Sequence, residues 1–169
     1  MIYDFITNKI KLKQEEYNQY IKEHRENVEK AFKELSTLWY KVGIINDDQI
    51  EALRKRVDRH DLSKYSTEEF EPYRRYFHYI DESERENAKE DFEIAWKHHY
   101  ENNDHHPEYW KGEKMDDVAV MEMVCDWQAM RYKFGGGTVR DYYEENKEKK
   151  QKVINKNSIE LLERLLSVV

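Results

Sequence analysis

Histidine and aspartate side chains recur in this sequence at spacings that could build a metal site. His24 stands alone, His60 is followed directly by Asp61, and four more histidines fall between residues 98 and 106. Imidazole and carboxylate together are the ligands of borderline divalent metals such as zinc, iron, manganese and nickel. Most of these residues fall on the apolar faces of predicted helices, where a polar side chain needs a partner. The pattern therefore indicates a buried metal centre.

The pair His60-Asp61 is the centre of this pattern. Both residues end a helix predicted over about residues 48–61, whose other core-facing residues are aliphatic. An imidazole and a carboxylate from one turn can bind one metal ion or bridge two. The alternative is a solvated helix end, at which the helix dipole favours a C-terminal histidine.

His24 and Asp126 extend the set of candidate ligands. His24 lies on the apolar stripe of a helix predicted over residues 13–41, where a lone histidine is commonly a hydrogen-bonded core residue. Asp126 lies in the most apolar predicted helix, over residues 115–134, and is costly to bury unpaired. Glu122 lies one turn earlier and would repel Asp126 unless a cation is near. That cation is a metal ion or, alternatively, an arginine or lysine of another helix.

The histidine-rich segment is the most specific local signal. It consists of His98-His99 and His105-His106, four histidines within nine residues. In a helix predicted over residues 82–102, His99 shares the inward face with the alanines, whereas His98 does not. The alternative is a surface tract with adventitious metal affinity, but a tryptophan on either side favours a packed environment.

The spacing of apolar residues predicts an all-α protein. They recur every three or four residues, and five glycines and two prolines in 169 residues argue against an all-β fold. We predict a single-domain helical bundle over residues 1–169, with C-terminal helices at 138–168. A capping box at Ser66-Thr67-Glu68-Glu69 is predicted to open the third helix. The apolar stripe of the last helix, which Asn157 is predicted to cap, either packs internally or forms the contact of a homodimer (Ile159, Leu162 and Leu166).

The third predicted helix places arginines on its exposed face. Arg74 and Arg75 are candidates for phosphate contacts, although a solvated face is the simpler interpretation. His78 falls among the same charged residues, so we place it outside the core. The buried side of this helix consists of three aromatic residues: Phe70, Tyr73 and Phe77.

Charge and cysteine content exclude several classes of protein. The chain has 29 basic and 36 acidic residues, a net charge of −7 and no basic block, which argues against an extended nucleic-acid surface. The single cysteine, Cys125, excludes an internal disulfide and suits a reducing compartment. No signal-peptide pattern opens the chain and no segment approaches the length of a membrane span. We therefore expect a cytoplasmic protein that does not bind a membrane.

The order of the candidate ligands resembles that of a known superfamily. HD-domain metalloenzymes carry the helical ligand pattern H…HD…H…H…D, which His24, His60-Asp61, the downstream histidines and Asp126 follow. The run HDLSK is similar to the H-D-x-G-K stretch of HD-GYP cyclic-dinucleotide phosphodiesterases and inositol oxygenase-like members, in which the lysine contacts an anionic or hydroxylated substrate. Over about residues 20–145, the strings HDLSKYSTEEFEPYRRYF, HHYENNDHHPEYW and EMVCDWQAM also resemble an uncharacterised family of phages and Gram-positive bacteria.

This resemblance implies an HD-like core at about residues 13–134 and a divalent metal ion, namely Mn, Fe, Zn, Ni or Mg. The implied metal ligands are His24, His60, Asp61, His99, His106 and Asp126. Lys64 would neutralise charge on a phosphate, and His105 or Glu122 would relay protons or orient a ligand histidine. The chain departs from the pattern in Ser63, which replaces the glycine, and in the short spacing of its histidine pairs. Either His99 and one of the two later histidines converge, or the site is mononuclear.

We therefore expect a metal-dependent hydrolase of a phosphate ester that uses metal-activated water. Its partner would be a small phosphorylated substrate, a nucleotide in the first instance. One alternative is a non-catalytic module of the phage type that binds a nucleotide or a protein on the same fold. The other is an HD-type iron oxygenase, which the context of Lys64 favours and the short histidine spacing opposes.

Overall fold

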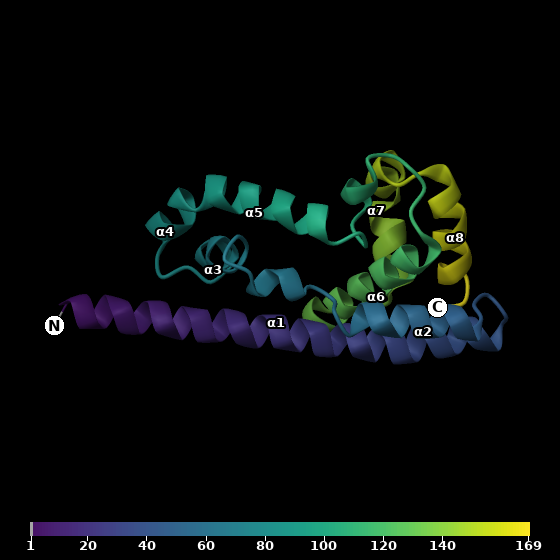
Figure 1. The fold of residues 1–169 in the computed structure, drawn as a ribbon, viewed down its shortest axis with the longest axis horizontal. Helices are drawn as coiled ribbons and strands as arrows, with labels where there is room; N and C mark the ends of the chain where they lie inside the picture. The colour runs from purple at the N-terminus through teal and green to yellow at the C-terminus, as the bar shows by residue number, and fades with distance from the viewer. Residues whose placement is uncertain (1) are drawn as a thin grey trace. The chain divides into compact units, whose positions relative to one another are not determined.

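The protein is built from α-helices. Its computed structural model describes residues 2–169, with side chains from Phe5 onward, and this part of the chain contains no strand (Figure 1). The all-α prediction is therefore confirmed. Among the described residues, no helix is both long and apolar enough to cross a membrane. In chain order the elements are α1 (Ile2–Lys41), α2 (Asp47–Val57), the 3-10 helix η1 (Leu62–Tyr65), α3 (Phe70–Phe77), α4 (Glu82–Asn87), α5 (Lys89–Asn102), the 3-10 helix η2 (Pro107–Trp110), α6 (Asp117–Phe134), α7 (Val139–Val153) and α8 (Lys156–Leu166).

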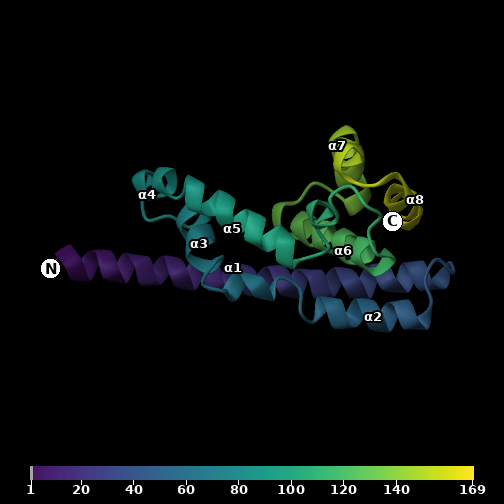
Figure 2. The same cartoon turned by 45° about the horizontal axis from the view of Figure 1, so that its top comes forward.

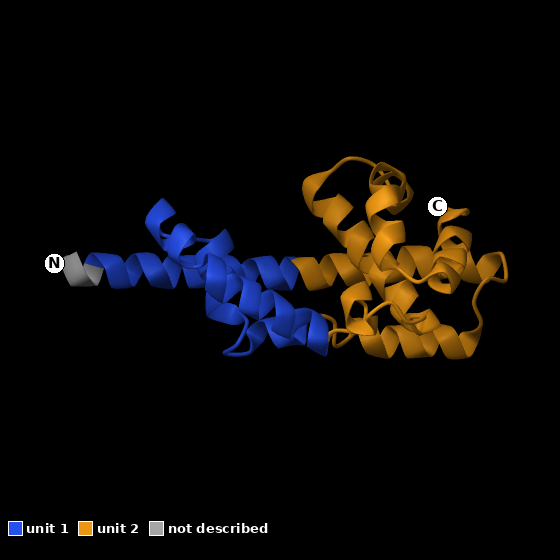
Figure 3. Cartoon of the chain, turned by 90° about the horizontal axis from the view of Figure 1, so that it is seen from above, with its two compact units in different colours: residues 1–23, 61–102 blue, residues 24–60, 103–169 orange. Residues whose placement is uncertain are grey.

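Two compact units divide these helices between them (Figure 3). Unit 1 comprises residues 1–23 and 61–102, and unit 2 comprises residues 24–60 and 103–169. Helix α1 therefore contributes its first part to unit 1 and the remainder to unit 2. Each unit has a hydrophobic cluster of its own. That the chain folds as a single domain stays a prediction.

Helix α6 is the centre of unit 2. Helices α2, α7 and α8 all pack against it, and α2 runs alongside the second part of α1 in both views (Figures 1 and 2). Every residue from 119 to 125 is buried, so the helix is covered on all sides. The side chain of Asp116 caps its first turn by accepting from the backbone N–H groups of Val118 and Ala119. This complete coverage is why the polar residues of α6 need partners.

The apolar stripe that the sequence predicts for α1, from Tyr17 to Leu38, is confirmed except at its C-terminal end. Val28 and Leu35 are buried as expected, but Leu38 is 39% exposed. Trp39 takes its place, fully buried, and its indole N–H donates to the carbonyl of Leu165 over 3.0 Å. The helix also begins at Ile2 rather than near residue 13. The part of α1 before residue 13 has no buried stripe from which this start could be predicted, because several of its apolar side chains are exposed (Phe5, Ile6 and Leu12).

The last two helices complete the core of unit 2. Leu162 and Leu166 are buried in it, so the C-terminal stripe packs internally. Asn155 caps α8, and the predicted cap at Asn157 is wrong by two residues. Helix α7 carries many charged residues, yet it buries Tyr143 against this core.

Unit 1 packs α3 against α4 and α5, and its buried cluster includes residues of α1. The cluster combines Tyr17 and Ile21 with Tyr73 and Ala95. The helix predicted over residues 82–102 is interrupted at residue 88, where α4 ends and α5 begins. The predicted burial of Phe77 is wrong, since this residue ends α3 and is 55% exposed.

The predicted ends of α2 and α3 also differ from the structure. Helix α2 ends at Val57 rather than at Asp61, so His60 lies in a turn. Helix α3 begins at Phe70, and the predicted capping box does not form, because no side chain caps this helix. Glu69, the intended partner in that box, is fully buried and has other contacts.

Arg74 is a buried cation, which corrects its predicted place on a solvated face. Its guanidinium is 2% exposed and donates to Glu84 over 2.7 and 2.9 Å and to Glu71 over 3.0 and 3.1 Å. Arg75 is partly exposed and pairs with Asp91 over 2.7 Å. Since carboxylates already neutralise both arginines, the structure gives no support to their predicted contact with a phosphate.

Replacing Arg74 with alanine should lower the free energy of unfolding by about 3 kcal/mol, because Glu84 would keep a largely buried charge without its partner. Arg75→Ala is the matched control. Its ion pair with Asp91 is exposed, so its loss should cost less than about 1 kcal/mol. Urea unfolding followed by circular dichroism measures both values. Equal losses in the two variants would contradict the interior role of Arg74.

Candidate metal centre

Three donor atoms from distant parts of the sequence converge within unit 2. His24 comes from α1, His60 from the turn after α2, and Asp126 from α6. His24 Nε2 lies 3.3 Å from His60 Nε2 and 3.1 Å from Asp126 Oδ1. His60 Nε2 lies 3.7 Å from the same carboxylate oxygen. Both histidines are buried, and this His–His–Asp group (His24, His60 and Asp126) is positioned to hold a metal ion.

The spacing of these atoms fits a small divalent cation. Ligands at about 2.0–2.1 Å from a tetrahedral zinc ion lie roughly 3.3 Å from one another. The three measured separations, 3.1, 3.3 and 3.7 Å, lie around that value. Two imidazoles and one carboxylate also form a set typical of catalytic zinc sites, in which a fourth position is left for water or substrate. The chemistry of the donors therefore agrees with their geometry.

Glu122 lies on the other side of the His60 ring and orients it. His60 Nδ1 and Glu122 Oε1 are 2.8 Å apart, and we assign the hydrogen to Nδ1 because a carboxylate only accepts. The lone pair of Nε2 is then directed toward His24 and Asp126. Metal-binding histidines almost always donate their second ring N–H in this way, which fixes the tautomer. This is the geometry expected of a residue that orients a ligand histidine.

Arg56 of α2 holds the second oxygen of Glu122. Its Nε donates to Glu122 Oε2 over 2.8 Å, and its guanidinium also pairs with Asp104. An arginine of another helix was the non-metal explanation for the two carboxylates of α6, and it holds for Glu122. It does not account for Asp126, which lies against the two histidines.

Both carboxylates of α6 are ionised at neutral pH. Burial acts to raise the pKa of Glu122, but the hydrogen bond from His60 and nearby positive charge outweigh it and lower the pKa to about 2. Burial opposes ionisation of Asp126 as well. The close contacts with His24 and His60 nevertheless hold the pKa of Asp126 well below its ordinary value. The site therefore presents negative charge to a cation.

Arg25 anchors the turn that carries His60. It donates to the carbonyl oxygens of His60 over 3.0 Å and of Asp58 over 2.8 Å. Because Arg25 follows His24 in α1, the same turn of helix supplies one donor and positions the other. No sequence pattern indicates this role, since Arg25 falls on the charged side of the α1 stripe.

His105 and His106 lie in the loop before η2. His105 is buried, with Nδ1 3.5 Å from Glu122 Oε1 and its ring centroid 4.4 Å from that of His60. Together with Glu122 and His60 it forms a second set of donors in unit 2 that could hold a cation. The ring of His106 lies 4.2 Å from that of His105, and its side chain is half-buried.

Unit 1 contains a second buried polar cluster, built around Asp61 and His99. Asp61 adopts a left-handed backbone conformation with φ of 56°, which is uncommon for a residue other than glycine. His99 Nε2 lies 3.3 Å from Asp61 Oδ1, and Lys64 Nζ lies 2.5 Å from Asp61 Oδ2. Burial acts to lower the pKa of His99, but the charge of Asp61 and hydrogen bonds to carboxylates raise it.

Glu69 is another residue of the polar clusters that no sequence pattern indicated. It is fully buried and accepts hydrogen bonds over 2.8 Å from Nδ1 of both His98 and His99. Ser63 Oγ donates to the same carboxylate over 3.1 Å. The sequence places Glu69 three residues after Ser66, which predicts a cap. No local pattern distinguishes a capping glutamate from a partner of histidines far along the chain.

The two units repeat one arrangement. In each, a buried histidine meets a glutamate through Nδ1 and an aspartate through Nε2. The combinations are Glu122–His60–Asp126 in unit 2 and Glu69–His99–Asp61 in unit 1. The predicted site residues thus fall into two groups, and the boundary between the units passes between the consecutive residues His60 and Asp61. Their roles as ligands or catalytic groups stay predictions.

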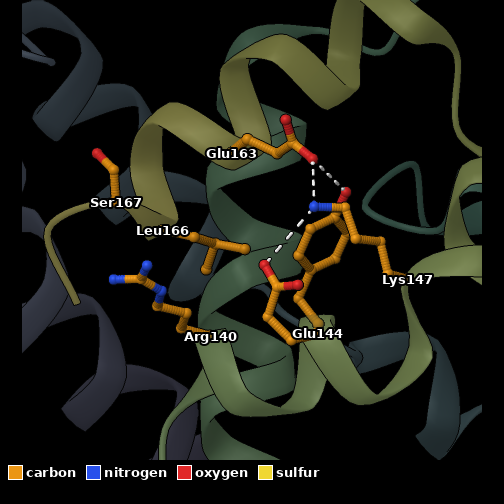
Figure 4. A pocket seen from close by; sticks show the side chains of 7 residues that line it. Arg140, Glu144, Lys147, Glu163, Leu166 and Ser167 are labelled. Carbon is orange, nitrogen blue, oxygen red and sulfur yellow. Dashed lines mark hydrogen bonds and ion pairs between the residues drawn. The ribbon is translucent and has the colours of Figure 1, made fainter.

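A separate pocket of about 220 Å³ lies at α7 and α8 (Figure 4). Lys147 Nζ lies 3.1 Å from Glu163 and 3.7 Å from Glu144, and the Tyr143 hydroxyl donates to Glu163 over 3.0 Å. Because carboxylates already neutralise this lysine, and no histidine lines the pocket, we do not consider it a candidate for metal or phosphate binding.

Comparison with known proteins places the chain in a family without assigning it an activity. A family model described as "Family of unknown function (DUF5662)" matches residues 13–168. Comparisons with curated proteins and with solved structures found no match.

Protein purified without a histidine tag should bind about one equivalent of a divalent ion at the His–His–Asp group. His24→Ala removes one of the three donors and Asp126→Asn removes the negative charge of another, so each should weaken binding by at least about 100-fold. Isothermal titration calorimetry with Mn, Fe, Zn and Ni measures the affinity. His78→Ala, a half-buried histidine outside both clusters, is the control and should bind as the wild type does. Failure of the wild type to take up any of the four ions would exclude this site.

Proposed function

We propose that this chain, which belongs to the DUF5662 family, is a metal-dependent hydrolase of phosphate esters with a nucleotide as its substrate. The observation that supports the proposal is the His–His–Asp group, whose donor atoms lie 3.1, 3.3 and 3.7 Å apart. Its three residues follow the order of the ligands in HD-domain metalloenzymes, which the sequence resembles. The proposal therefore combines a measured geometry with a sequence pattern.

Neighbouring side chains orient the donors of the His–His–Asp group and supply negative charge for a cation. Glu122 holds Nδ1 of His60, so the Nε2 lone pair is available to a metal ion. Asp126 is ionised and supplies negative charge. A divalent ion, when bound, would lower the pKa of a coordinated water to about 7 and polarise a phosphoryl oxygen. Three protein donors would leave a position open for that water.

Other residues have proposed roles that follow from the resemblance. Asp61, His99 and His106 are proposed as additional ligands. Lys64 is proposed to neutralise charge on the phosphate. His105, which lies 3.5 Å from Glu122, is proposed to relay protons. The buried Asp61–His99 contact of 3.3 Å supports a shared role for these two residues.

Hydrolysis of bis-para-nitrophenyl phosphate and of a nucleotide panel by metal-loaded protein tests the proposal. Asp126→Asn and Asp61→Asn should each lower kcat/KM by at least about 100-fold. Glu122→Gln should lower it by about tenfold, because the amide of glutamine cannot accept from both His60 and Arg56. Glu144→Gln changes an exposed carboxylate of the α7–α8 pocket and should leave the rate unchanged. Activity that survives Asp126→Asn would come from a contaminant and would contradict the proposal.

Two other results would point to the alternative functions. Nucleotide binding without hydrolysis, unaffected by chelation and by Asp126→Asn, would identify a binding module. Oxygen consumption by iron-loaded protein would identify an oxygenase. Each result is incompatible with hydrolysis at the His–His–Asp group as the function of this chain.

A further inference from the structure

Two tyrosine hydroxyls in unit 1 are buried without a hydrogen bond. Tyr17 of α1 is 1% exposed and Tyr73 of α3 is 7% exposed. Neither hydroxyl has a hydrogen-bond partner among the described residues. Such groups are uncommon in folded proteins, and each calls for an explanation such as a functional role or a bound group. Tyr143 in unit 2 shows the ordinary case, since it is equally buried and its hydroxyl donates to Glu163 over 3.0 Å.

Both hydroxyls lie close to the polar cluster of unit 1. The two rings are nearly parallel, with 14° between their planes and 6.5 Å between their centroids. Burial is the main cause that raises the pKa of both phenols, and the negative charges of Asp61 and Glu69 raise it further. Both remain protonated at neutral pH and keep a hydrogen to donate.

The nearby carboxylates already accept from other groups. Glu69 accepts from His98 and His99 over 2.8 Å each. Asp61 accepts from Lys64 over 2.5 Å and faces His99 at 3.3 Å. His98, His99 and Lys64 therefore already supply donors to these carboxylates, and the two phenol O–H groups have no hydrogen-bond acceptor among the described residues.

The charges around the hydroxyls suit a ligand that brings acceptor oxygens. Lys64 Nζ lies 6.0 Å from the centroid of the Tyr73 ring and offsets the charge of Asp61. The ring of His99 lies 6.0 Å from the same tyrosine. An apolar ligand would leave both hydroxyl hydrogens unpaired, and a metal cation makes no use of O–H donors.

We propose that the hydroxyls of Tyr17 and Tyr73 form a ligand subsite that donates hydrogen bonds to the oxygens of a phosphate ester. These oxygens belong to the phosphoryl group or to a hydroxyl of the attached sugar. The choice of a phosphate ester rests on the proposed function. The existence of a donor subsite rests only on the burial and surroundings of the two tyrosines.

Thermal unfolding of the phenylalanine variants gives the first test. Removing a buried hydroxyl that has no partner should leave Tm unchanged or raise it, so Tyr17→Phe and Tyr73→Phe should be at least as stable as the wild type. Tyr143→Phe is the matched control. It loses the hydrogen bond to Glu163, and its Tm should fall by about 2 °C. A loss of Tm in the first two variants equal to that in the control would show that their hydroxyls have internal partners, and would overturn the proposal.

Ligand binding to chelator-treated protein gives the second test, with inorganic phosphate and ribose as separate probes. One of the two should raise the Tm of the wild type. The Kd of that probe should be about tenfold weaker in Tyr17→Phe and Tyr73→Phe and unchanged in Tyr143→Phe. A response to phosphate identifies the phosphoryl oxygens as the ligand group, and a response to ribose identifies the sugar hydroxyls. The proposal is overturned if neither probe binds, or if all variants bind as tightly as the wild type.

The subsite and the metal centre can fail independently. Absence of metal uptake by the wild type would overturn the hydrolase, while the binding result in chelated protein would stand. Metal uptake and hydrolysis with unaltered Kd in the two phenylalanine variants would overturn only the tyrosine subsite.

Discussion

A buried carboxylate must be paired, and the pairing of Glu122 is the interaction on which the rest of unit 2 depends. Glu122 lies in α6, the helix against which α2, α7 and α8 pack, and it is 4% exposed. His60 and Arg56 both donate to it, so the end of α2 is tied to α6 at this point. The same hydrogen bond turns Nε2 of His60 toward two further donors. The carboxylate of Glu122 therefore contributes both to the stability of unit 2 and to the geometry of the candidate metal centre.

In unit 1 the buried carboxylate of Glu69 is likewise paired with histidine. The burial of the histidines in both units therefore has the same physical explanation. An imidazole buried next to carboxylates contacts them through both ring nitrogens. These hydrogen bonds and charge interactions offset the free-energy cost of removing the ring from water. His99 has such contacts with Glu69 and Asp61. A histidine held on both sides has one orientation, which is what metal binding or proton transfer requires.

Much of the fold could be predicted from the sequence, because the spacing of apolar residues predicts amphipathic helices. Where helices are exposed or interrupted, the pattern was less informative. Phe77 looked buried by spacing alone, yet it ends α3 and is exposed. Trp39 took the core position expected for Leu38. Arg74 looked solvated, because its partner Glu84 lies in α4 and meets it only once α3 and α4 are packed together. Whether such a side chain is buried depends on which other element covers its face of the helix. The local spacing of residues does not contain that information.

By itself, the sequence determined which chemical groups are present and on which helical faces they lie. It identified His24 and Asp126 as polar residues on apolar stripes, because burial of such groups is costly at any position. Only the tertiary structure decided which of them meet. The contact between His24 and His60 joins positions 36 residues apart, and that between His60 and Glu122 joins positions 62 apart. The roles of Glu69 and of the buried tyrosines appeared only there as well, because a hydrogen-bond partner, or its lack, is a property of three-dimensional neighbours.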